Sequence, residues 1–194
     1  MTSELVDRLR AAPLTGRPPS FATAEVAYAV HDTALGRMLL ARRDSGPLVA
    51  SMFVTDHRGE DRALDRLASV VSPRVLRIPA ALDDVRRRLD DYLAGSRRDL
   101  DVELDWALAS PWQRVVLGAL ARRVPYGART TYGQLAAWAG RPKAARAVGA
   151  ALGANPLCVL VPCHRVVGGR GALTGYAGGL AAKALLLDVE HRLA

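Results

Sequence analysis

Short apolar runs and helical periodicity divide the first hundred residues into strands and helices. Apolar runs bounded by Gly, Pro, Asp or Ser are typical of strands, and apolar residues spaced three or four apart are typical of helices. The expected strands cover residues 22–30, 36–41, 48–54 and 75–78, and the expected helices cover 3–12, 60–71 and 80–93. Because the first two strands are close enough for a hairpin, the pattern predicts a small α/β domain with an antiparallel-type sheet.

Helical patterns dominate after residue 105. Ser110 and Pro111 are a typical N-cap and first-turn pair for a helix that continues to Arg123. Further helices are expected over residues 132–138, capped by Thr131 or Thr130, and over 142–152 and 180–193. The two short helices flank a Gly-containing turn, which favours a winged or plain helix-turn-helix motif.

The polar stretch 97–105 separates these two patterns and is the expected domain boundary. The fold class is therefore predicted to be α+β. An N-terminal domain of supporting role is expected at residues 1–104, and a mainly helical domain that carries the chemistry is expected at 105–194.

The balance of basic and acidic residues distinguishes the two parts of the chain more clearly than their helical and strand patterns do. Residues 1–103 carry 16 Lys plus Arg against 16 Asp plus Glu, whereas residues 104–194 carry 11 against 3. No acidic residue occurs between Asp105 and Asp188. A surface of one sign suits a polyanion, of which nucleic acid is the first candidate, although a merely solvated arginine-rich surface gives the same counts.

The third helix of the basic part is unusually thin. Ala and Gly occupy most of residues 144–153, and Arg146 is the one long side chain after Lys143. A helix with ordinary side chains is about 10–12 Å across and the minor groove of B-DNA is about 6 Å wide. Small side chains let the backbone approach that groove, so the helix predicts sequence-independent minor-groove binding. Tight packing against a neighbouring helix would explain the same composition.

Several classes of protein are disfavoured by composition. The N-terminal residues lack a basic leader followed by an apolar segment, and no apolar run approaches the roughly 18 residues of a membrane span. Two cysteines five positions apart do not make a disulfide framework. We therefore expect a cytoplasmic protein that has no membrane partner and keeps both thiols reduced.

Cys163 and His164 form the sharpest local feature, a thiol beside an imidazole within an apolar run. A thiol is nucleophilic as its thiolate, and His164 is the nearest group that can take the proton. Glu190 is a candidate to orient that imidazole, or else an exposed acid beside Arg192. A buried structural thiol remains an alternative, whereas a metal site shared with Cys158 lacks a fourth ligand, so no metal is expected.

Six segments together resemble the O6-alkylguanine-DNA alkyltransferases, also called methylated-DNA-protein-cysteine methyltransferases. They are Val124-Pro125-Tyr126-Gly127, Thr131-Tyr132-Gly133-Gln134-Leu135-Ala136, Ala144-Ala145-Arg146-Ala147-Val148-Gly149, Asn155-Pro156, Pro162-Cys163-His164-Arg165-Val166 and Tyr176-Ala177-Gly178-Gly179-Leu180. The resemblance covers about residues 111–193, and the first half matches only in general organisation.

The resemblance implies a role for each matching residue. Cys163 is similar to the acceptor of the alkyl group, and His164 and Glu190 to the partners that draw off its proton through a water. Tyr132 is similar to the tyrosine that assists departure of guanine, and Arg146 to the arginine that replaces the extruded nucleotide in the stack. The other implied residues are Asn155, which braces the active-site turn; the DNA contacts Thr131, Lys143, Ala147 and Gly149; and the base pocket of Val166, Tyr176, Ala177, Gly178 and Gly179.

The expected function is direct reversal of alkylation in double-stranded DNA. A methyl or larger alkyl group would pass from O6 of guanine, and from O4 of thymine, to Cys163 after the base leaves the stack. The resulting thioether is a poor leaving group, so each molecule would act once. We further expect a monomer that needs no cofactor and that can bind cooperatively along DNA. Ala177 replaces a serine found in some relatives, which puts pocket selectivity in question.

Three other functions fit parts of the pattern. A non-enzymatic alkyltransferase-like protein would bind the lesion without transfer, but such relatives lack the acceptor cysteine. A Cys-His hydrolase is disfavoured by the basic half and the thin helix, and a transcription regulator would show strong sequence preference.

Overall fold

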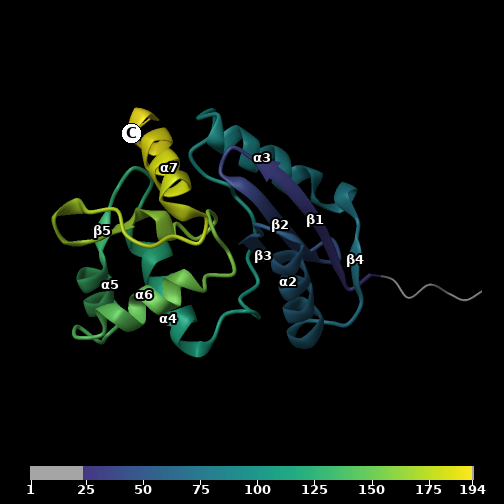
Figure 1. Cartoon of the computed structure of the whole chain (residues 1–194), viewed down its shortest axis with the longest axis horizontal. Coiled ribbons are helices and arrows are strands. Elements are labelled where there is room, and N and C mark those ends of the chain that lie inside the picture. The colour runs from purple at the N-terminus through teal and green to yellow at the C-terminus, as the bar shows by residue number, and fades with distance from the viewer. Residues whose placement is uncertain (1–23, 194) are drawn as a thin grey trace, which may run out of the picture.

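A computed structural model describes residues 24–193, so the helix predicted at residues 3–12 lies outside the described part. Two regions lie side by side in Figure 1, one built on a sheet and one built from helices. Their connection runs through residues 94–110. The α+β fold class predicted from the pattern is confirmed.

The N-terminal region is a four-stranded sheet in the order β3-β2-β1-β4. The strands are β1 (Val26–Thr33), β2 (Gly36–Arg43), β3 (Leu48–Phe53) and β4 (Val75–Arg77). The first three are antiparallel, with the predicted hairpin between β1 and β2, and β4 adds to β1 in parallel. The sheet is therefore mixed, because the chain crosses over through a helix before it returns as β4.

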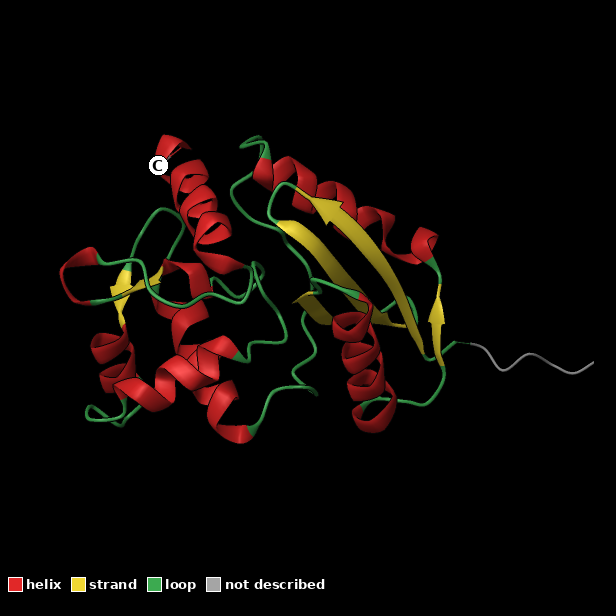
Figure 2. Cartoon of the chain, in the orientation of Figure 1, coloured by secondary structure: helices red, strands yellow, loops and turns green. Residues whose placement is uncertain are grey.

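The two long helices of this region cover opposite faces of the sheet, as Figure 2 shows. They are α2 (His57–Val70) and α3 (Asp83–Leu93), with the short 3₁₀ helix η1 (Pro79–Leu82) preceding α3. Alternate residues of a strand point to opposite faces. Leu39 of β2 accordingly packs with Leu67 of α2, whereas the next residue, Leu40, packs with Val85 of α3.

The C-terminal region consists of four helices joined by short irregular segments. They are α4 (Pro111–Arg123), α5 (Tyr132–Trp138), α6 (Ala145–Gly153) and α7 (Gly179–Leu193). Ser110 and Gln113 form a capping box at α4, and Thr131 caps α5. The smaller elements are β5 (Thr130–Thr131), η2 (Cys163–Arg165), β6 (Val166–Val167) and η3 (Gly169–Gly171).

Helix α6 begins three residues later than its pattern predicts. The expected start at residue 142 falls in the turn between α5 and α6, where Ala144 takes the N-cap position without a side-chain cap. Val148 is fully buried in the core shared with α4 and α5. The predicted helix-turn-helix thus corresponds to α5 and α6. None of the described helices is long and apolar enough to cross a membrane.

The edge of the N-terminal sheet continues into the segment that precedes Cys163. Ser51 of β3 donates its backbone N–H to the Pro156 carbonyl at 2.8 Å and accepts one from the Cys158 N–H at 2.8 Å. Its hydroxyl also donates to the Cys158 carbonyl at 2.9 Å. The cysteine segment is therefore held as a short parallel extension of β3, which ties the two regions together.

Candidate active site

Asn155 fixes the turn that presents Cys163. Its side-chain amide donates to the Val161 carbonyl and to the Cys163 Sγ, each at 3.3 Å, and its side-chain oxygen accepts from the Leu157 N–H at 2.9 Å. Asn155 and Cys163 are both buried. The thiol, which opens η2, is thus held by a side chain that is itself fully engaged with the backbone.

The two buried thiols differ in how readily they ionise. A hydrogen bond from Cys158 lowers the pKa of Cys163, and bonding from Asn155 and the charge of Lys183 act in the same direction, against the effect of burial. The same hydrogen bond and burial raise the pKa of Cys158 well above its usual range. Of the pair, Cys163 is therefore the one that becomes a thiolate, which is the nucleophilic form.

Glu190 is the buried, ionised hydrogen-bond partner of His164. The His164 Nε2 and the Glu190 Oε1 are 2.5 Å apart, and both side chains are almost completely buried. Burial opposes ionisation of Glu190, but hydrogen bonds from His164, Arg165 and Tyr92 outweigh it and lower the pKa of Glu190 to about 2. Glu190 is thus no exposed acid: Arg192 pairs instead with Asp188 at 2.8 Å.

His164 is held as a neutral imidazole. Burial lowers its pKa, and the hydrogen bond from its ring to Glu190 opposes that effect only in part. Because an ionised carboxylate can only accept, the ring proton sits on Nε2 and Nδ1 carries a lone pair. That Nδ1 is buried and hydrogen-bonds to no protein group of the described chain. It is the atom able to accept a proton near Cys163.

Two basic residues of the chain are internal rather than part of the basic surface. Arg165 donates from Nε to the Glu190 Oε2 at 2.9 Å and from a terminal nitrogen to the Val124 carbonyl at 2.8 Å. Lys183 donates to the carbonyls of Val166 and Thr174 at 2.6 and 2.7 Å. The sequence pattern offers one signal for Lys183, a lone cation within the apolar run of residues 180–187.

The loop before α7 packs against both regions. The ring of Tyr176 lies edge-on to His164 and to Phe53, with ring centroids 6.4 and 5.5 Å apart. A Cβ on Gly178 would lie 2.6 Å from the Phe53 ring, so only glycine fits there. Gly179 starts α7 at a φ of +84°, whereas Ala177 is exposed. Phe53 thus shapes this loop, although nothing in the sequence pattern signals it.

The residues expected to contact DNA lie on α6, at the start of α5 and in the turn between these helices. Arg146 and Lys143 are exposed, and Thr131 is the N-cap of α5. The Ala147 carbonyl accepts from the Trp112 indole at 3.3 Å, which anchors α6 on α4. Helix α6 is therefore packed on its neighbours through one face and leaves a thin, basic face toward solvent.

Tyr132 connects this surface to the buried site. Its ring packs over Gly149, where a Cβ would be 3.7 Å away. Its hydroxyl accepts from the Thr174 hydroxyl at 3.2 Å, and the Thr174 carbonyl is one of the two that bind Lys183. Most predicted site residues thus lie either in a buried group around Cys163 or on the surface at residues 131–149, with Tyr132 between the two. Ala177 and Gly179 are instead exposed where the loop meets α7.

Known proteins resemble the chain in sequence and in structure. Residues 111–192 match the sequence model of the 6-O-methylguanine DNA methyltransferase DNA-binding domain. The methylated-DNA-protein-cysteine methyltransferase of Mycolicibacterium paratuberculosis is 40% identical, over 86% of this chain and 93% of that protein. The protein of the same name from Methanosarcina acetivorans is 37% identical, over 84% and 97%.

Solved structures agree with these matches. The Mycobacterium tuberculosis OGT crystallised in complex with DNA superposes with a TM-score of 0.72 at 34% identity, covering 87% of this chain and 94% of that one. The Pyrococcus kodakaraensis O6-methylguanine-DNA methyltransferase superposes at 0.63 and 25% identity, covering 85% and 98%. Since the similarity extends over nearly the whole length of these relatives and includes both regions of the fold, the chain belongs to the methylated-DNA-protein-cysteine methyltransferases, which repair O6-methylguanine in DNA directly.

Proposed function

We propose that Cys163 is the residue that receives the alkyl group from O6 of guanine, with His164 and Glu190 as its proton-accepting partners. The observation that carries this assignment is the pairing of a thiol of lowered pKa with a neutral imidazole whose other nitrogen is held by an ionised carboxylate. A nucleophile, a base and a group that orients the base are what such a transfer requires.

The reaction balances with the groups at hand. The Cys163 thiol gives its proton toward the Nδ1 of His164, through a water in the relay that the family resemblance implies. The thiolate sulfur then forms a bond to the alkyl carbon as the bond from that carbon to O6 breaks. Guanine keeps the electron pair of the broken bond and takes up one proton, which balances the proton lost by the thiol. Tyr132 would assist this departure of guanine. The thioether product has no leaving group, so one molecule repairs one lesion.

We further propose that the chain binds double-stranded DNA through α5 and α6. Support comes from the exposed basic side chains of this surface and from the relative crystallised with DNA. Extrusion of the damaged base costs a few kcal/mol, and Arg146 would offset part of it by filling the space left in the stack. Thr131, Lys143, Ala147 and Gly149 would lie along the DNA backbone in the minor groove.

The remaining parts of the hypothesis concern substrate range and organisation. Transfer from O4 of thymine, one protein per lesion and cooperative binding along DNA stay predictions, as does the domain boundary after residue 104. The base pocket is assigned to Val166 and to the loop of Tyr176, Ala177, Gly178 and Gly179. Two free thiols are consistent with the cytoplasmic location expected from the sequence.

Intact-mass measurement after incubation with an O6-methylguanine oligonucleotide tests the assignment. The expected result is a gain of one methylene per chain that saturates at one. A tryptic peptide from Ala147 to Arg165 contains both cysteines, so fragmentation must place the methyl on Cys163 rather than Cys158. Cys163→Ala is the matched control. Bound lesion without a gain in mass would instead identify a lesion-binding protein, and turnover on thioesters would identify a hydrolase.

A further inference from the structure

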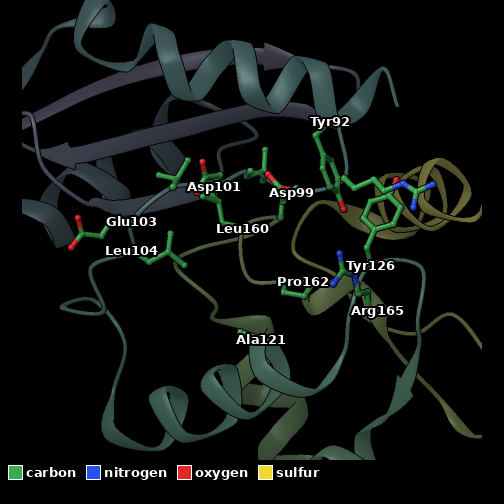
Figure 3. Close-up of a pocket in the computed structure, with 14 residues that line it drawn as sticks. Tyr92, Asp99, Asp101, Glu103, Leu104, Ala121, Tyr126, Leu160, Pro162 and Arg165 are labelled. Carbon is green, nitrogen blue, oxygen red and sulfur yellow. The ribbon is translucent and has the colours of Figure 1, made fainter. Parts of the chain in front are cut away.

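Tyr92 brings the N-terminal region into contact with the proton relay. It lies in the last turn of α3 and is only 2% exposed. Its hydroxyl donates to the Glu190 Oε1, the same oxygen that accepts from His164. In Figure 3 the Tyr92 side chain descends from its helix at one end of a cleft between the two regions, with Tyr126 and Arg165 opposite.

The Tyr92 hydroxyl can act only as a donor in this position. Burial, and after it the negative charge of Glu190, raise the pKa of Tyr92 far above its usual range. The phenol therefore keeps its proton at neutral pH. A second phenol, Tyr126, packs edge-on against it with ring centroids 5.8 Å apart, but its hydroxyl donates to the Val189 carbonyl instead.

The Glu190 carboxylate is thus shared among donors from three parts of the chain. Oε1 accepts from Tyr92 of α3 and from His164, and Oε2 accepts from the Gly127 N–H at 3.2 Å. The Arg165 Nε donates to both oxygens, at 3.1 Å to Oε1 and 2.9 Å to Oε2. Each hydrogen-bond donor to a carboxylate stabilises the ionised carboxylate. It also weakens the attraction of that carboxylate for the protons of its other partners. A donor on Oε1 consequently affects both where the His164 ring lies and how strongly it holds a proton.

We propose that Tyr92 is a positioning residue for alkyl transfer, through which the N-terminal region sets the orientation and basicity of His164. It does not touch the substrate and acts through Glu190. The inference rests on the proposed role of His164 as proton acceptor. It gives the N-terminal region a specific part in the reaction, beyond the support expected of it.

The predicted effect has a definite sign. Tyr92→Phe removes one donor from Oε1, so Glu190 attracts the His164 Nε2 proton more strongly and the pKa of His164 rises. A more basic His164 becomes protonated at higher pH, where it can no longer accept from Cys163. The other titratable or charged groups facing the pair are Arg165 from η2, Lys183 from α7, Tyr126, Tyr176 and Cys163. None of them is altered by this substitution.

The test compares single-turnover transfer rates of wild type, Tyr92→Phe and Tyr126→Phe between pH 5 and 9, with O6-benzylguanine as the substrate. Tyr92→Phe should move the acid limb upward by about half a pH unit, which lowers the rate along that limb by about threefold. Tyr126→Phe removes a hydroxyl from the same cleft that does not bind Glu190, and it should leave the profile unchanged. An unaltered profile for Tyr92→Phe, or a uniform loss that follows its thermal stability, would overturn the proposal.

Two further measurements separate this inference from the proposed function. In a Glu190→Gln background, Tyr92→Phe should change the rate less than twofold, because both changes act on one interaction; independent, multiplying effects would contradict it. The His164 ring can also be titrated by NMR in the resting protein. An upward shift in Tyr92→Phe supports the positioning role even if Cys163 accepts no alkyl group, and an unshifted titration overturns it.

Discussion

The charged side chains around Cys163 are buried and hydrogen-bonded, whereas those on the exposed surface of α6 and of the turn before it lie in solvent. Around the thiol, every charged side chain is buried and bonded: Glu190 has four donors and Lys183 two carbonyl acceptors. On the surface, Arg146 of α6 and Lys143 of the turn before it are exposed to solvent. Charge in a buried site is costly unless partnered, whereas charge on a surface is free to meet a phosphate.

The difference explains which interactions each region can tolerate losing. Removing one partner of a buried pair leaves the other uncompensated, with a cost of about 3–5 kcal/mol. Removing one exposed cation loses only its share of the binding to a polyanion. On the proposed assignment, rigidity near Cys163 would serve the orientation of reacting atoms, and accessibility of α6 would serve contact with DNA. The following predictions test that division.

Cys163→Ala should have the largest effect, because it removes the thiol whose pKa is lowered. We expect no detectable methyl transfer, measured as the mass gain after incubation with a methylated oligonucleotide. Affinity for DNA should stay within about twofold of wild type, since the thiol is buried. Residual transfer to Cys158 would show that the two thiols are interchangeable.

Salt should weaken DNA binding steeply, because the proposed binding surface would act through phosphates. With about four phosphate contacts, raising the salt concentration fourfold lowers affinity by about a hundredfold. Fluorescence anisotropy of a labelled duplex measures this slope. Reaction with free O6-benzylguanine, which has no phosphates, should be unaffected by the same change. A flat response of DNA binding would contradict the assignment of α5 and α6.

Arg146→Ala should slow repair of duplex DNA by about thirtyfold, because the extruded base would leave an unfilled stack. The reaction with free O6-benzylguanine should change less than twofold. Arg122→Ala is a suitable control, since that side chain is also exposed but comes from α4. Equal slowing on duplex and free base would place Arg146 in the chemistry instead of in the stack.

Cys158→Ala should have the smallest effect. DNA binding and transfer should both persist, but loss of the hydrogen bond to the thiolate should raise the pKa of Cys163. The ionised fraction of Cys163 falls when its pKa rises, so the alkaline rise in rate should move to higher pH, with a loss of about threefold at pH 7. A stopped-flow pH profile measures it. A downward shift would contradict the direction of that hydrogen bond.

Local patterns were sufficient for most of the secondary structure. Apolar spacing and a Ser-Pro pair locate α4 at its observed bounds, and Thr131 marks the start of α5, because capping and periodicity depend on neighbours in sequence. The start of α6 was predicted too early, since residues 142–144 have a composition that suits either a turn or a helix. The parallel pairing of β4 was missed because pairing direction depends on the path of the chain.

Some residues of the candidate site could likewise be selected from the sequence, and others could not. Cys163 and His164 are adjacent in sequence, and Glu190 is a rare acid in a basic region, so all three could be selected from sequence and family resemblance. Arg165 lies in the acid-free stretch that predicts a basic surface, yet it is buried against Glu190. Its neighbours in sequence do not reveal a partner 25 residues away.

Sequence by itself determined the elements, the charged half and the thiol-imidazole pair, because these depend on residues close together in the chain. Only the tertiary structure decided which buried groups meet. Tyr92 is 98 positions from Glu190, and Ser51 is 107 positions from the Cys158 carbonyl that it binds. Such contacts follow from how the sheet edge and α3 dock on the helical region. No local pattern encodes that docking, because it arises from packing of the whole chain.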